Sequence, residues 1–159
     1  MIDLNRKIKA VFLEHYNTSR WSNPVAITLT LKRAIPSGPG LVCGSAEHYS
    51  QNLRHSLNVI QGKLFGSRGR HKAPRLKVIP ILEKDQSGRH HYHLALELRN
   101  LMPLEEFREL IYNVWSNTDW GYKQIDAKQA DGGWLLYMTK LRSKGGDLSS
   151  SIDWENLHY

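Results

Sequence analysis

Apolar and polar residues recur along the chain with two periods, one typical of helices and one typical of strands. Helical spacing of apolar residues is found in residues 3–16, 45–64 and 133–141. A further helix is expected from Pro103 to about residue 116, because proline is favoured in a first helical turn. The pattern therefore predicts helices near both ends and in the middle of the chain.

Strands are predicted where β-branched and other apolar residues alternate with polar ones or form short apolar runs. The segments that fit this pattern are 25–33, 76–83, 91–98 and 122–129. The second and third are joined by residues 84–90, a polar hairpin loop, and are expected to pair as antiparallel neighbours. Residues 34–44 are interpreted as a loop because they include two prolines and three glycines. This mixture of helices and antiparallel strands predicts an α+β fold.

The composition fits one folded domain with a basic surface. The chain has 159 residues, of which 40% are hydrophobic, and this is enough to bury a core. Its formal net charge of +7 suits a polyanionic partner such as nucleic acid.

The chain lacks several features that would indicate other classes of protein. Its single cysteine, Cys43, excludes an intramolecular disulfide and a cysteine-rich zinc cluster, and favours a reducing compartment. No apolar run is long enough to cross a membrane and no signal-peptide pattern is present, so we expect a soluble intracellular protein with no membrane partner. There is no Gly-x-x-x-x-Gly-Lys-Ser/Thr phosphate loop, so any DNA unwinding would need a separate helicase.

The most informative stretch is His91-Tyr92-His93, at the start of the strand predicted over residues 91–98. Residues two apart on a strand point to the same face, so both imidazoles should project together and Tyr92 should face the other side. Glu83 ends the preceding apolar run, and antiparallel pairing would bring its carboxylate near the imidazoles. Two imidazoles and one carboxylate suit Mg²⁺ or Mn²⁺ better than a closed structural zinc site.

A tyrosine and a lysine near the C-terminus add a possible nucleophile. The helix predicted over residues 133–141 has Asp131 as a plausible N-cap. Tyr137 and Lys140 are three residues apart, so they share a face of this helix. A tyrosine near a metal can act as a nucleophile, and a neighbouring lysine can stabilise phenolate or phosphate charge.

Together these elements resemble the HUH endonucleases, in particular the rolling-circle replication initiators (Rep proteins). His91-Tyr92-His93 resembles their His-hydrophobic-His motif, although its central residue is bulkier than the usual aliphatic one. Tyr137-Met138-Thr139-Lys140 fits the Tyr-x-x-Lys motif, and residues 26–31 (Ala-Ile-Thr-Leu-Thr-Leu) resemble the first-strand motif. Glu83 stands where such proteins have a third metal ligand. The resemblance spans about residues 25–141.

The resemblance implies a fold, an activity and a site. The fold would be an RRM-like antiparallel sheet of about five strands flanked by helices, as one endonuclease domain over residues 1–159. A divalent ion, Mn²⁺ or Mg²⁺, would be held by Glu83, His91 and His93. Tyr137 would attack a phosphate of single-stranded origin DNA, leaving a 5′-phosphotyrosine and a free 3′-hydroxyl, while Lys140 offsets developing charge. Such nicking initiates rolling-circle replication.

The expected partner is single-stranded DNA, with a flanking hairpin as a source of recognition. The replicon would be in the cytoplasm of a prokaryote or another host of a mobile element, or in the nucleus if the host is eukaryotic. The basic loop over residues 66–75 is favoured as a nucleic-acid contact over a merely solvated loop. The candidate nucleic-acid-binding residues are Lys32, Arg68, Arg70, Lys72 and Arg75.

Other functions fit parts of the same pattern. A single-tyrosine transposase of an insertion sequence has a similar length, His-x-His pair and tyrosine helix, but that helix usually has Gln where this chain has Lys140. A relaxase usually has its tyrosine ahead of the histidines. A non-catalytic RRM-like nucleic-acid-binding module would need aromatic residues on the exposed sheet face, where His91 and His93 are expected. A structural metal protein fits least, because the three ligands leave coordination positions open.

Neighbouring residues have plainer interpretations. His90 has the opposite strand parity to His91 and is interpreted as a loop residue. Glu97 shares parity with His93, but it lies about 13 Å away along the strand. Trp134 is expected to pack rather than to stack on a base.

Overall fold

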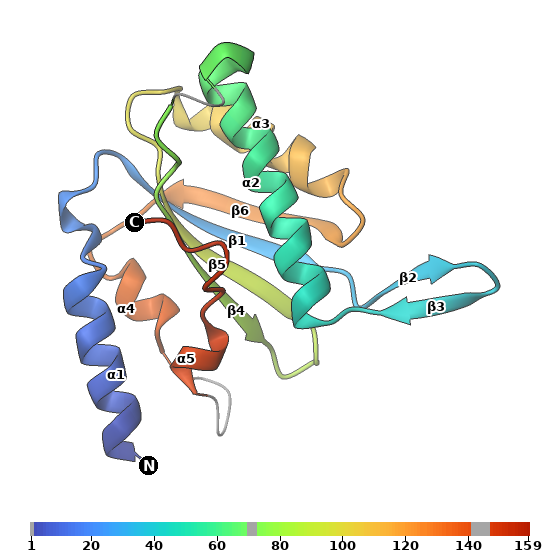
Figure 1. The fold of residues 1–159 in the computed structure, drawn as a ribbon, viewed down its shortest axis with the longest axis horizontal. Helices are drawn as coiled ribbons and strands as arrows, with labels where there is room; N and C mark the ends of the chain where they lie inside the picture. Colours follow the sequence, from blue (N-terminus) through green and yellow to red (C-terminus); the bar gives the residue numbers. More distant parts are fainter. Residues whose placement is uncertain (1, 70–72, 141–146) are drawn as a thin grey trace.

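The computed structural model describes residues 2–69, 73–140 and 147–159, which form a central sheet with helices on both faces (Figure 1). The sheet has four antiparallel strands, in the spatial order β4, β5, β1, β6. Their bounds are Pro24–Leu31 (β1), Val78–Lys84 (β4), His90–Glu97 (β5) and Gly121–Gln129 (β6). The predicted α+β class is confirmed, and all four predicted strands are present. About five were expected, and this sheet has four.

Helices cover the two faces of the sheet unequally. On one face lie α2 (Ala46–Gly69) and α3 (Leu104–Ser116). On the other face lie α1 (Ile2–His15), α4 (Trp134–Met138) and α5 (Leu148–Ser151). A short 3₁₀ helix, Thr18–Arg20, links α1 to β1. The helices predicted over 3–16 and from Pro103 are confirmed, and the one over 45–64 continues to Gly69 with a kink at Gly66.

The alternation of residues along each strand divides the core into two layers. Ile27 of β1 and Leu94 of β5 are fully buried in the larger cluster, under α2 and α3. Ile79 of β4 and Ala95 of β5 point the other way, into the smaller cluster under α1, α4 and α5. Both faces of the sheet are therefore covered over part of their area.

Residues 34–44 form a hairpin rather than the predicted loop. β2 (Ala34–Ser37) and β3 (Gly40–Cys43) pair as a separate two-stranded antiparallel sheet. The turn between them has Gly38 at a φ of 55°, a left-handed conformation that glycine adopts at little cost. The glycines and prolines of this segment correctly predict a turn. The apolar stretches on either side of the turn are too short to predict strands.

The C-terminal segment closes the outer edge of β4. Ile152 and His158 form antiparallel bridges with Ile81 and Val78, and backbone hydrogen bonds join His158 to Val78 in both directions. This segment thus shields an edge that would otherwise expose unpaired backbone groups. The serine-rich sequence of this segment has no strand pattern that would indicate these bridges.

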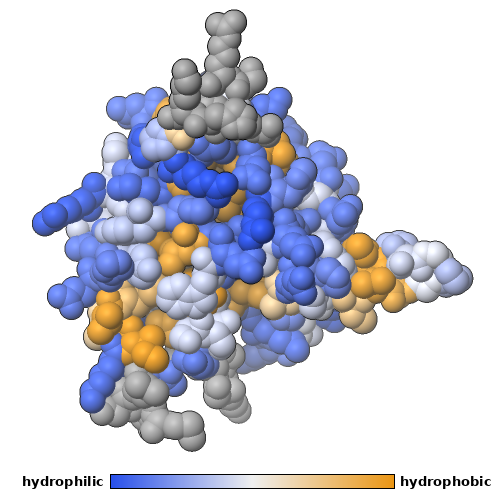
Figure 2. Space-filling view, in the orientation of Figure 1, coloured by the Kyte–Doolittle hydropathy of each residue, from blue (hydrophilic) through white to orange (hydrophobic). Residues whose placement is uncertain are grey.

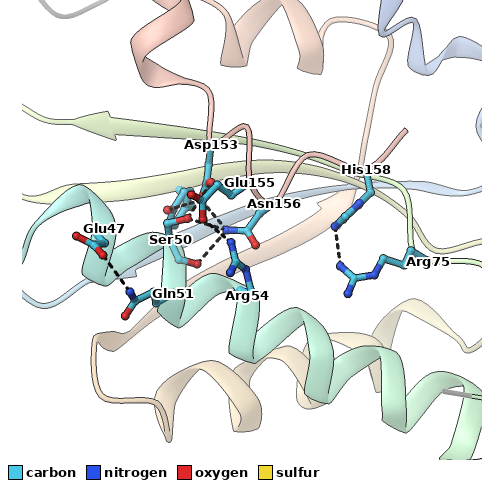
Figure 3. Close-up of polar contacts among 10 residues, drawn as sticks. Glu47, Ser50, Gln51, Arg54, Arg75, Asp153, Glu155, Asn156 and His158 are labelled. Carbon is cyan, nitrogen blue, oxygen red and sulfur yellow. Dashed lines mark hydrogen bonds and ion pairs between the residues drawn. The ribbon is translucent and has the colours of Figure 1, made fainter. Parts of the chain in front are cut away.

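Asp153 links this segment to the histidine strand (Figure 3). Its carboxylate accepts hydrogen bonds from Tyr92 Oη (2.8 Å), Ser50 Oγ (2.9 Å) and Asn156 Nδ2 (2.8 Å). Burial, and then the adjacent Asp153 carboxylate, raise the pKa of the Tyr92 phenol well above its usual range, so Tyr92 remains a neutral donor. Tyr92 therefore faces α2, away from the histidines on either side of it, as strand parity predicts.

Replacing Asp153 should destabilise the fold. Asp153→Ala removes three hydrogen bonds and leaves the buried Tyr92 hydroxyl without its acceptor, so we expect a loss of about 2–4 kcal/mol in the free energy of unfolding. Tyr92→Phe should cost about 1 kcal/mol, because Asp153 keeps its other donors. Urea unfolding followed by circular dichroism measures both. Glu155→Gln is the matched control, since Glu155 forms an exposed ion pair with Arg54 and its loss should change stability by less than about 1 kcal/mol.

Candidate metal and tyrosine site

His91 and His93 project from the same face of β5, as their spacing predicts. In the strand register, His91 lies opposite Thr30 on β1 and His93 lies opposite Thr28. On the other side of β5, Glu83 of β4 is the direct partner of His91. Since directly opposed residues point to the same face of a sheet, the two threonines and Glu83 lie on the face of the imidazoles.

Each imidazole is held at both of its ring nitrogens. Nδ1 of His93 lies 3.2 Å from Thr28 Oγ1, and Nδ1 of His91 lies 3.2 Å from Thr30 Oγ1. The opposite nitrogens face carboxylates: His93 Nε2 is 3.0 Å from Glu83 Oε2, and His91 Nε2 is 2.9 Å from Asp85 Oδ2. A hydrogen bond at one nitrogen fixes the ring orientation and directs the other nitrogen toward a ligand.

Asp85 is a site residue that the sequence interpretation missed. It was assigned to the hairpin loop, although its position two residues after Glu83 gives it the same strand parity. Hydrogen bonds from Ser87, and then from His91, hold the pKa of the Asp85 carboxyl well below its usual range. The site therefore has a second carboxyl group, that of Asp85, beside Glu83.

Glu83 and His93 are donors of the kinds that bind divalent ions, and their nearest atoms are 3.0 Å apart, which is the distance of a direct ion pair. In the present conformation, no three His, Cys, Asp or Glu side chains within the described residues lie close enough together to hold one ion. Joint coordination by Glu83, His91 and His93 would need His91 to turn from Asp85, or Asp85 to move with it.

Tyr137 lies beside His93. The two ring centroids are 5.9 Å apart with the rings perpendicular, and Trp134 stacks on Tyr137 at 5.2 Å. Trp134 is itself fixed by a 2.8 Å hydrogen bond from its Nε1 to the carbonyl of Leu94. Because 37% of Tyr137 is exposed, the residue is accessible at the site rather than part of the core. Trp134 packs, as expected.

The helix that presents Tyr137 is shorter than predicted. It covers Trp134–Met138 instead of residues 133–141, and its N-cap is Gly133 rather than Asp131. Asp131 instead accepts a 2.9 Å hydrogen bond from the Gly133 backbone N–H, in the turn before the helix. Buried Leu135 and Met138 hold this short helix on the sheet, so tertiary packing compensates for its length.

Lys140 follows the helix and borders the same cleft as Tyr137. This cleft opens between α1, α4 and the sheet, and Thr28 lies at its base next to the imidazoles. Three lysines and two carboxylates line it together with the Trp134–Tyr137 stack: Lys9, Lys128, Lys140, Asp126 and Asp131. The cleft therefore offers cations and aromatic rings. Glu83, His91 and His93 do not line it, and the cleft meets them through Thr28, which contacts His93 Nδ1, and through Tyr137, whose ring lies beside that of His93.

The proposed nucleic-acid contacts are not gathered at this site. Arg75 is exposed, donates to His158 Nε2 at 2.9 Å, and precedes the end of β4 that is remote from Glu83. Lys32 follows β1, near the base of the hairpin, and donates to the carbonyl of Asp119 at 3.1 Å. The side chain of Arg68 and all of Arg70 and Lys72 lie outside the described residues.

The two alternative residues have structural roles. Glu97 is buried and accepts hydrogen bonds from the Ser22 backbone (3.0 Å) and Arg99 (3.3 Å) at the far end of β5. His90 is the first residue of β5 rather than a loop residue, and its ring is 5.1 Å from that of Tyr49, on the opposite side from His91. Burial lowers the pKa of His90, which favours its neutral form.

Comparison with protein-family models, curated proteins and solved structures found no match to this chain. Within the described residues, none of the helices is long and apolar enough to cross a membrane.

Proposed function

We propose that the protein is a metal-dependent endonuclease that cleaves single-stranded DNA through a covalent bond to Tyr137. The observation that carries this proposal is the 5.9 Å separation of the Tyr137 and His93 rings. The histidine pair and the tyrosine motif are far apart in the chain, and each could occur by chance. A nucleophile of this type beside two oriented imidazoles and two carboxylates is the arrangement that such a reaction needs.

The chemistry follows from the positions of the side chains. Tyr137 Oη attacks the scissile phosphorus and forms a phosphotyrosine bond to the 5′-phosphate of the strand downstream of the break. The bond from phosphorus to the 3′ oxygen breaks, and the proton lost by the phenol is balanced by one gained at that oxygen, giving a 3′-hydroxyl. Lys140 offsets negative charge near the phenolic oxygen. A divalent ion held by Glu83, His91 and His93 would supply Lewis-acid polarisation of the phosphate.

The covalent intermediate retains the energy of the phosphodiester bond. A 3′-hydroxyl can therefore attack the Tyr137 adduct and rejoin a strand, or it can prime DNA synthesis. Both outcomes suit a nickase that initiates rolling-circle replication at an origin, with a separate helicase unwinding the duplex.

The open cleft favours a single strand as the substrate. Lys9 and Lys128 line the same cleft as Tyr137, so the phosphates of one strand can find cations there while an unpaired base meets the exposed Tyr137 ring. In a duplex the bases are paired with each other and cannot reach this ring.

A covalent-adduct assay tests the proposal. The protein is incubated with labelled single-stranded oligonucleotides of random sequence, with and without flanking stems, in Mn²⁺ or in EDTA. We expect a band that resists denaturing electrophoresis, forms only with metal, and is removed by protease. Cleaved DNA without any protein-linked strand would instead indicate a hydrolytic nuclease, and the absence of both would refute nuclease activity.

The lysines of the cleft should determine much of the affinity for single strands. Lys9→Ala with Lys128→Ala should weaken binding and lower the slope of log affinity against log salt by about 1.4, or about 0.7 for each lost phosphate contact. Fluorescence anisotropy at several salt concentrations measures this slope. Lys63→Ala, an exposed substitution on α2 across the sheet, is the control and should leave the slope unchanged.

A further inference from the structure

The β2–β3 hairpin projects from the body of the protein (Figure 1), and Figure 2 shows hydrophobic residues over the part nearer the body and near-neutral residues at the tip. None of residues 34–43 is charged, although 23% of the whole chain is. Leu41 is 71% exposed, the largest exposed fraction among the large hydrophobic residues that the structure describes. Exposing apolar side chains of a projecting hairpin to water is unfavourable, so this hairpin is a candidate contact surface.

The two sides of the hairpin have different roles. Ile35 and Val42 are paired across it and pack against the larger core cluster. Pro36 and Leu41 form the next pair, so their side chains point to the opposite side. One side thus joins the hairpin to the core, and the other presents apolar groups outward.

The base of the hairpin is firmly anchored. Lys32 N–H donates to the Trp120 carbonyl (2.9 Å), Gly44 N–H donates to the Arg33 carbonyl (2.8 Å), and Tyr49 Oη donates to the Lys32 carbonyl (3.0 Å). A Cβ atom at Gly44 would lie 2.0 Å from Tyr49 Oη, so a glycine is needed for this ring to reach its acceptor. The direction of the hairpin is therefore set by the sheet.

A chain of hydrogen bonds joins this base to the histidine site. Arg33 donates to the Ser87 carbonyl (2.7 Å) and to Ser87 Oγ (3.1 Å), and Ser87 Oγ donates to Asp85 (2.6 Å). Asp85 in turn faces His91 at 2.9 Å. The hairpin therefore projects from the end of the sheet at which the candidate metal ligands lie.

Cations lie near the base of the hairpin, and none of residues 34–43 is charged. Lys32 and Arg33 precede β2, and Arg33 donates to Ser87 of the β4–β5 loop, which also contains Arg89. The end of a DNA duplex presents phosphates and one exposed base pair. The cations of the protein can contact the phosphates, and its apolar side chains can contact the base pair. Leucine and proline are residues that DNA-bending proteins insert against base steps. Contact with a second copy of the chain would use the apolar groups but would leave the neighbouring cations without a role. The cations therefore favour DNA as the partner.

We propose that residues 34–43 form a wedge that rests on the end of a DNA stem, next to the single strand that enters the tyrosine cleft. Pro36 and Leu41 contact the terminal base pair, and Lys32, Arg33 and Arg89 contact the phosphates beside it. This inference rests on the proposed function, because it assigns the duplex that flanks the cleaved strand. Its consequence is that a stem-loop binds better than the same strand without a stem.

The test compares two DNAs and two variants. One DNA has a short stem followed by a single-stranded extension, and the other has the same extension with one stem arm scrambled. The double variant Pro36→Ser with Leu41→Ser should bind the stem DNA on the order of tenfold more weakly, the loss expected for one stacking contact, and should bind the unpaired DNA as the wild type does. Val11→Ser, at another exposed apolar residue (65%) on α1, should change neither affinity.

The outcomes separate this proposal from the nuclease proposal. Binding is measured by anisotropy in EDTA, so it does not depend on cleavage, and thermal unfolding verifies that the double variant folds. A stem-specific loss supports the wedge even if no Tyr137 adduct ever forms. Equal loss on both DNAs, or no loss on either, overturns the wedge. Sedimentation that shows a wild-type dimer and a monomeric double variant, without a stem-specific loss, would assign the surface to a second copy and also overturn it.

Discussion

Tyr137→Phe should abolish the covalent DNA adduct. The substitution keeps the ring, so the stack on Trp134 and the perpendicular contact with His93 remain, but it removes the oxygen that we propose attacks phosphorus. We expect strand cleavage to fall by at least about 10³-fold, with no change in fold or in DNA affinity. Quantifying adduct and cleaved strand on one denaturing gel measures both products.

The assignment to Tyr137 needs a control at a similar tyrosine. Tyr112 is 45% exposed, compared with 37% for Tyr137, but it lies on α3, which packs on the opposite face of the sheet. Tyr112→Phe should therefore keep full activity. Mass spectrometry of the digested wild-type adduct should place the nucleotide on the peptide with Tyr137, and its presence on another peptide would overturn the assignment.

Lys140→Ala separates charge stabilisation from nucleophilic attack. Because Tyr137 keeps its hydroxyl, cleavage should become slower, by about 10- to 100-fold, rather than disappear. An unchanged rate would mean that Lys140 only binds DNA, in which case the affinity should fall instead.

Removing the metal ion should lower strand cleavage as strongly as Tyr137→Phe does. EDTA should stop cleavage, and added Mn²⁺ or Mg²⁺ should restore it. Glu83→Gln and His93→Ala each remove one of two donors 3.0 Å apart, so both should lower cleavage by at least about 10³-fold and remove the rise in melting temperature on adding Mn²⁺. Calorimetric titration with Mn²⁺ measures the affinity directly. Glu106→Gln, on the exposed side of α3, is the control and should bind Mn²⁺ as the wild type does.

The substitution Asp85→Asn tests whether Asp85 binds the metal ion directly or only orients His91. If Asp85 orients His91 without touching the ion, Mn²⁺ binding should weaken by about 10- to 100-fold. A loss as complete as that of Glu83→Gln would make Asp85 a direct ligand. Unchanged Mn²⁺ binding in Asp85→Asn, Glu83→Gln and His93→Ala alike would refute a metal site at these residues.

The main part of the sheet was predictable because strand alternation is a local property. β1, β4, β5 and β6 all lie within a few residues of their predicted bounds, and the shared face of His91 and His93 follows from their spacing alone. Antiparallel pairing of β4 with β5 was predictable for the same reason, since one short polar loop joins them.

Elements that depend on partners elsewhere in the chain were less predictable. The hairpin over residues 34–43 is a separate two-stranded sheet, rooted by Tyr49 and Trp120 from other elements. The short α4 exists because Leu135 and Met138 are buried, and a helix of five residues has little stability of its own. The serine-rich tail has no strand pattern, and its bridges to β4 rely on the hydrogen bonds of Asp153 with α2 and Tyr92.

The amino-acid sequence by itself determined which residues could do chemistry and which side of a strand each histidine faces, because strand periodicity lies in the local backbone. Only the tertiary structure decided that Tyr137 lies beside His93, that Asp85 faces His91, and that the hairpin projects from the same end of the sheet. These are contacts between separate elements. Their geometry depends on how the two core layers pack against the sheet. A local sequence pattern does not contain information on that packing.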